Sequence, residues 1–175
     1  MKRFFFGAAL ILLLALGAPL KAFDSGVSFS VATGMGRRLF SLFIEESFGR
    51  SKDHTFYALS YHTPALLGSL PLRSTFTAYL NDHPIKEYRS FGVGWLPAVI
   101  LHTDPVYFTA GLGPFIKNRK TVAQGGYFAL NMQAGIGISM TPVAIEFFVR
   151  HISNCYTARP NKAGDLIGVS IGVGI

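Results

Sequence analysis

The sequence predicts an all-β fold, an eight-stranded antiparallel transmembrane β-barrel of the outer-membrane type. Three observations lead to this prediction. The chain begins with an export signal, half of its 175 residues are hydrophobic while only 14% are charged, and apolar and polar residues alternate along most of its length. A hydrophobic exported chain without membrane-spanning helices has one common solution, a closed barrel whose strands satisfy each other's backbone hydrogen bonds within the membrane.

The predicted export signal is a cleaved secretory signal peptide at residues 1–22. Its first three residues are basic, residues 4–16 are apolar but too few to span a membrane as a mature helix, and Ala22 is the expected last residue removed. An uncleaved anchor is the weaker alternative, because the apolar run is short and is followed by glycine and proline. Residues 23–175 are then expected to form one barrel domain, integral to the bacterial outer membrane.

Charge and composition exclude several classes of function. Loss of three basic residues with the signal lowers the formal charge from +7 to +4, a mild excess that argues against a nucleic-acid partner. One basic cluster, Lys117, Arg119 and Lys120, is interpreted as a solvated loop. The single cysteine, Cys155, excludes an internal disulfide and is interpreted as a small, partly buried filler, and the five dispersed histidines offer no metal spacing. We therefore expect neither metal nor cofactor.

Nine segments alternate with the two-residue period of a β-strand. In order they are 27–32, 39–48, 54–62, 72–80, 90–99, 106–113, 128–139, 143–153 and 165–175. The aromatic segment 54–62 alternates least clearly, and Glu46 interrupts the apolar face of 39–48. Turn residues separate the later segments, near 82–84, 102–105 and 140–142.

The two faces of these segments differ in kind. One face carries Leu, Ile, Val and Phe, and the other is rich in Gly, Ser, Thr, Asn and Gln. A soluble β-sandwich also alternates, but the face that meets water would carry many charged residues. The small, mostly uncharged polar face found here is typical of the filled interior of a small barrel with lipid outside.

Bacterial barrels have an even number of strands, so eight of the nine segments are expected to form this one. The excess lies before residue 66, where either residues 27–48 form one bent strand or part of that stretch caps the lumen. An even count places both ends of the barrel in the periplasm, so the loop 154–164 faces outward from the cell.

The last two segments carry reactive side chains. His151 and Ser153 continue the apolar face of 143–153, and Asp165 begins the apolar face of 165–175, so all three are expected on the lipid side near the outer leaflet. Pairing across the loop can bring Asp165 beside them. Ser153 is then a candidate nucleophile, His151 the base that removes its proton, and Asp165 the acid that orients the imidazole.

The loop between these segments holds two asparagines, Asn154 and Asn161, either of which can donate an amide hydrogen to a developing oxyanion. The competing interpretation is an ordinary polar rim, since loop ends are commonly polar. Polar groups on a lipid-facing surface are costly without a purpose, which favours a site. On the inner face, Glu146 and Arg150 stand four residues apart and are expected to form an ion pair in the lumen.

These residues form a string that resembles the C-terminal signature of the outer-membrane lipid A 3-O-deacylases, the PagL family. The family shows H-x-S-N, then a P-N pair, then an acidic residue. The matching positions are His151-Ile152-Ser153-Asn154, Pro160-Asn161 and Asp165, and the spacing agrees without a gap. The resemblance implies a lipid-facing triad of Ser153, His151 and Asp165, with Asn161 and Asn154 assisting the oxyanion.

Three positions depart from the family pattern. The acid is usually glutamate, and Asp165 is one methylene shorter, which limits its reach toward His151. Lys162-Ala163 follows the P-N pair where the family often has Asp-Gly, and Cys155 takes a place usually held by a small residue.

The resemblance implies an esterase that hydrolyses the 3-O-linked acyl chain of lipid A, with lipid A or lipopolysaccharide as its partner among the outer-membrane lipids and without a cofactor. A homodimer is compatible with it. Two alternatives stay open: a non-catalytic barrel, structural or adhesive, that has kept the hairpin, and an esterase for other membrane lipids.

Overall fold

The structure, a computed structural model, describes residues 25–34, 54–67, 70–161 and 163–174. The expected signal peptide and the candidate strand at 39–48 lie outside these residues. Within the described ranges, no helix is long and apolar enough to cross a membrane.

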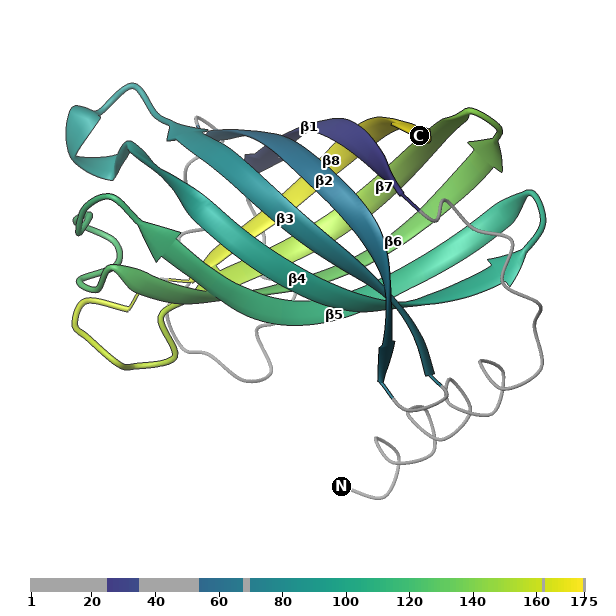
Figure 1. Cartoon of the computed structure of the whole chain (residues 1–175). Coiled ribbons are helices and arrows are strands. Elements are labelled where there is room, and N and C mark those ends of the chain that lie inside the picture. Colours follow the sequence, from purple (N-terminus) through teal and green to yellow (C-terminus); the bar gives the residue numbers. More distant parts are fainter. Residues whose placement is uncertain (1–24, 35–53, 68–69, 162, 175) are drawn as a thin grey trace, which may run out of the picture.

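Eight strands form one closed barrel in which every strand is antiparallel to its two neighbours (Figure 1). They are β1 (Gly26–Gly34), β2 (Thr55–Leu67), β3 (Leu70–Asp82), β4 (Ser90–Thr103), β5 (Val106–Lys117), β6 (Phe128–Met140), β7 (Val143–Ser153) and β8 (Gly164–Gly174). β1 pairs with both β2 and β8, so the described strands close the ring by themselves. The predicted eight-stranded barrel is confirmed, with the aromatic segment as its second strand.

The predicted alternation is also the observed one. Apolar side chains at alternate positions point out of the barrel and are about half exposed, such as Phe29, Phe76 and Phe147. Their neighbours point inward and are buried. A narrow lumen leaves little room where large inward residues face a neighbouring strand, and small residues make that room: a Cβ on Gly94 would lie 2.0 Å from the Phe115 ring.

The connections divide between the two ends of the barrel. Two-residue turns join β4 to β5 and β6 to β7 at one end. At the other end, on the left of Figure 1, lie the longer connections 83–89, 118–127 and 154–163. The first of these was expected to be a short turn, but it contains a 3₁₀ helix, η1 (Lys86–Tyr88). Short turns at one end and long loops at the other are the usual arrangement of outer-membrane barrels.

A buried ion pair crosses the lumen, but it is not the predicted one. Arg73 Nη2 donates to Glu146 Oε2 at 2.8 Å, so the partner of Glu146 is a residue of β3. Arg150 instead donates its Nε to Gln133 Oε1 at 3.0 Å and lies over the rings of Phe56 and Phe148. The prediction of a Glu146–Arg150 pair was wrong because spacing along one strand does not show which charge crosses the barrel from another strand.

Candidate active site

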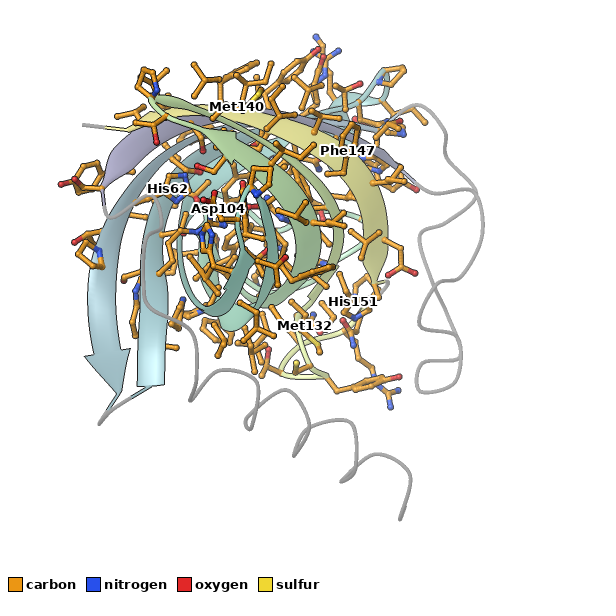
Figure 2. The ribbon with its side chains drawn as sticks, turned by 90° about the vertical axis from the view of Figure 1, so that its right-hand side faces the viewer. His62, Asp104, Met132, Met140, Phe147 and His151 are labelled. Carbon is orange, nitrogen blue, oxygen red and sulfur yellow. The ribbon has the colours of Figure 1, made fainter. Side chains whose placement is uncertain are left out.

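The site lies where β7 ends and β8 begins. The strand register places His151 opposite Asp165 on one side and opposite Met132 on the other. Figure 2 shows Met132 and His151 beside each other at the barrel wall. His151, Ser153 and Asp165 belong to the outward-facing rows of their strands, as predicted, yet each is only 4% exposed while Phe147 in the same row is 59% exposed. The outward row is therefore sheltered at this end of the hairpin.

His151 and Asp165 form a buried pair. His151 Nδ1 lies 2.7 Å from Asp165 Oδ1, and both side chains are almost fully buried. An ionised carboxylate only accepts hydrogen bonds, so a neutral imidazole in this pair carries its proton on Nδ1 and has Nε2 as its basic nitrogen. The short acid reaches because directly opposed residues of antiparallel strands have Cβ atoms only about 4.5–5.5 Å apart.

Ser153 ends β7, two residues after His151 on the same face of the strand. The chain then turns back sharply, with Cys155 and Tyr156 both at positive φ, 49° and 60°. This turn brings Cys155 Sγ to 3.6 Å from Ser153 Oγ. Cys155 is exposed, so its interpretation as a partly buried filler was wrong. Nothing in the sequence pattern indicated that a thiol would neighbour the candidate nucleophile.

The two loop asparagines have different surroundings. Asn154 is fully buried, and its side chain is engaged within the loop: Nδ2 donates to the carbonyls of Ala158 and Pro160, and Oδ1 accepts from the Tyr156 N–H. Asn161 Oδ1 accepts from the Asn154 N–H at 3.0 Å. Its buried Nδ2, in contrast, has no hydrogen-bond partner among the described residues. Asn154 thus shapes the loop, and Asn161 holds an amide donor in reserve.

The connection 118–127 braces this loop from the side. Gly125 N–H donates to the Pro160 carbonyl at 2.8 Å, and Gln124 forms an isolated β-bridge with Asn161. Gln124 also donates its Nε2 to the carbonyl of Ile152, the residue between His151 and Ser153. A bracing role for Gln124 was not predicted, because the two connections are brought together only by the closed barrel.

Comparison with known proteins decides the family. The model of the lipid A 3-O-deacylase (PagL) family matches residues 57–174, which include all seven strands from β2 to β8 apart from the first two residues of β2. The chain belongs to this family. A search of curated proteins gives no match.

The fold agrees with this family assignment. A solved structure, described as the crystal structure of the outer membrane enzyme PagL, matches with a TM-score of 0.56 at 14% sequence identity, over 85% of this chain and 99% of that one. Agreement over nearly the whole length of that barrel at so low an identity shows a shared fold. The PagL family resemblance found at the C-terminal hairpin is thereby confirmed.

The structure brings together most of the residues predicted from the hairpin. His151 and Asp165 are in contact, Ser153 lies on the same face, and Asn154 and Asn161 are bonded to each other. It adds residues that the sequence did not indicate, above all Cys155 beside Ser153 and Gln124 behind Ile152. Bonds between loops that are distant in sequence leave no periodic signal, so these two could not be found before the fold was known.

Proposed function

We propose that this protein is an outer-membrane esterase that hydrolyses the 3-O-linked acyl chain of lipid A, with Ser153 as nucleophile, His151 as base and Asp165 as the acid that orients it. The observation that carries the proposal is the buried His151–Asp165 pair at 2.7 Å on the outward-facing row of β7 and β8, two residues from a serine. Membership of the lipid A 3-O-deacylase family supports the choice of substrate.

In the first half of the proposed reaction, His151 Nε2 takes the proton of Ser153 Oγ while Oγ attacks the ester carbonyl carbon. The carbonyl electron pair moves to its oxygen and forms a tetrahedral oxyanion. As the intermediate collapses, the bond to the sugar oxygen breaks, and the imidazolium returns its proton to that oxygen. The products of this half are an acyl-serine and a lipid A with a free hydroxyl.

In the second half, water repeats the attack on the acyl-serine. His151 takes a proton from the water, the new tetrahedral intermediate collapses, and Ser153 Oγ recovers a proton as the fatty acid leaves. Asp165 stabilises the imidazolium in both halves and holds its ring in place. Burial of the pair makes this electrostatic support stronger than it would be in water.

Asn161 is the proposed oxyanion donor. A buried amide N–H without a partner is costly, and an oxyanion in the reaction would supply the partner. The Asn154 N–H fixes the orientation of the Asn161 amide by donating to its oxygen. We assign Asn154 to shaping the loop, since its own amide hydrogens already bond the carbonyls of Ala158 and Pro160.

Placement of the site on the outside of the barrel suits a substrate that diffuses within the membrane. The acyl ester of lipid A lies at the boundary between sugar and hydrocarbon, and the site lies at the end of the barrel where apolar strands meet polar loops. This placement, with residues 1–22 removed on export, supports residence of residues 23–175 in the outer membrane with the long loops outside.

Mass spectrometry of lipid A tests the proposal directly. Cells that produce the protein are expected to contain lipid A that lacks the 3-O-linked chain, whereas cells with Ser153→Ala are expected to contain intact lipid A. Folding of the variant is checked by the heat-dependent electrophoretic mobility of the barrel. Loss of the acyl chain in cells with a well-folded Ser153→Ala protein would show that Ser153 is not the nucleophile.

A further inference from the structure

A second cavity lies inside the barrel at the end where the long connections gather. It encloses about 620 Å³, and Ile152 and Leu166 form part of its wall. Both point inward, whereas their sequence neighbours His151, Ser153 and Asp165 belong to the outward rows. This cavity, the lumen pocket, is therefore on the opposite side of the sheet from the candidate active site.

The apolar part of the lumen pocket consists of three stacked aromatic rings. Tyr79 lies between Phe56 and Phe115, with ring centroids 5.2 Å and 4.7 Å away and planes inclined by 15° and 13°. Each ring comes from a different strand, so the stack spans the lumen. Stacked rings present a flat apolar surface that accepts an alkyl chain or another ring.

A buried cation stands at the polar part of the pocket. Lys117, expected in a solvated loop, instead points into the lumen at the end of β5 and is only 6% exposed. Its Nζ donates to the neutral Oε1 of Gln124 at 2.8 Å. No carboxylate of the described residues lies within ion-pair distance of Nζ. A buried ammonium group without a counter-charge is costly, which favours the entry of an anion.

Neutral polar groups complete the rim. His54 and Asn81 both line the pocket and are joined by a hydrogen bond of 3.0 Å between Nδ1 and Oδ1. An aromatic floor, one cation and a neutral rim together match a ligand with an apolar tail and a single negative head. A cationic ligand would meet Lys117, and a polyanion would find a single counter-charge.

We infer that the lumen pocket binds an amphipathic carboxylate, with its apolar tail on the three rings and its head on Lys117 Nζ. A free fatty acid has this chemistry. Its identification with the acyl chain released at the outer face rests on the proposed function, whereas the pocket itself does not.

Octanoate is a suitable probe because its short chain keeps it soluble. Binding of octanoate labelled with ¹³C at the carboxyl is measured by NMR with the Ser153→Ala chain in phospholipid nanodiscs, and empty nanodiscs and octanol serve as controls. Lys117→Met is expected to weaken octanoate binding by about tenfold, as for loss of a charge-assisted hydrogen bond, with octanol binding unchanged. Lys120→Met, at an exposed lysine of the adjoining connection, is expected to leave both unchanged.

Lys117→Arg guards against a folding defect, since it keeps the charge and is expected to keep octanoate binding. Octanoate signals identical to those with empty nanodiscs, or equal octanoate affinity in the Lys117→Met and unsubstituted pockets, would overturn the inference. Because the test uses the Ser153→Ala chain, its outcome is independent of lipid A hydrolysis: a barrel that fails to deacylate lipid A can still bind octanoate, and an active one can fail to bind it.

Discussion

At the scale of single residues, the site depends on direct opposition across two strands. Asp165 faces His151 in the register of β7 and β8, so an acid one methylene shorter than glutamate still reaches Nδ1 at 2.7 Å. The departure from the family pattern at this position is therefore compatible with a triad. Which side-chain groups remain for chemistry is decided equally locally, as the contrast between Asn154 and Asn161 shows.

Asp165→Asn is expected to lower the rate of lipid A deacylation on the order of 10³–10⁴-fold, because an amide can hold the imidazole in the wrong tautomer. Rates are measured with purified lipid A and the refolded barrel. Asp165→Glu keeps the charge and restores the usual family acid, so it is expected to retain activity. Equal losses in the two variants would argue that Asp165 acts only through packing.

Asn161→Asp separates the two functions of the Asn161 side chain. The carboxylate can still accept the hydrogen bond from the Asn154 N–H but cannot donate to an oxyanion. We expect kcat to fall by about 10²–10³-fold, the usual cost of one oxyanion donor, with little change in KM. A rise in KM with unchanged kcat would instead assign Asn161 to substrate binding.

At the scale of elements, the hairpin of β7 and β8 does not stand alone. The connection 118–127 packs against the loop 154–163 so closely that a Cβ on Gly125 would lie 1.9 Å from the carbonyl oxygen of Arg159. Gln124 ties the same connection to the end of β7 through the Ile152 carbonyl. The geometry of the candidate site thus depends on two loops from two different hairpins.

Gly125→Ala is expected to displace the loop 154–163 and to lower deacylase activity by at least about tenfold, since misplacement of a catalytic group by about 1 Å is costly. Gly126→Ala is the matched control, because its Cβ would find its nearest neighbour, Ala158 Cβ, at 3.3 Å. Activity and the heat-dependent mobility of each barrel are compared. Equal activity in the two variants would contradict the bracing role of the connection.

At the scale of the whole molecule, barrel closure puts charges and rings from distant strands into one narrow lumen. Glu146 Oε1 accepts hydrogen bonds from Thr109 and Gln133, and its Oε2 accepts one from Arg73. Nearer the long loops, Arg150 lies over Phe56 and Phe148. The lumen is therefore a packed polar and aromatic core, which keeps the wall that carries the site rigid.

Arg73→Met is expected to destabilise the barrel by about 3–5 kcal/mol, because it leaves the Glu146 carboxylate buried without its partner. The free energy of unfolding is measured in urea with the refolded barrel in lipid. Adding Glu146→Gln removes the stranded charge and is expected to recover part of that loss. If the two substitutions are additive, the ion pair contributes no coupling energy and the expectation is wrong.

Much of this architecture was predictable because membrane barrels impose a strict pattern. Alternation along each strand and the polar character of the inner face predicted the barrel and seven of its eight strands clearly. The position of β2 was less clear, since aromatic residues on both faces of 54–62 blur the period. The motif around His151 predicted the candidate residues because neighbours on one strand and across one hairpin have a fixed relation.

What the sequence by itself determined is everything that depends on local period and spacing: the strands, the outward row that holds His151, Ser153 and Asp165, and the family signature. Only the tertiary structure decided the partner of Glu146, the inward placement of Lys117, the contact between Cys155 and Ser153, and the bracing by Gln124. The physical reason is that most of these contacts join segments far apart in the chain. Their distances are set by closure of the barrel and by the folding of its loops against each other, neither of which leaves a repeat in the sequence.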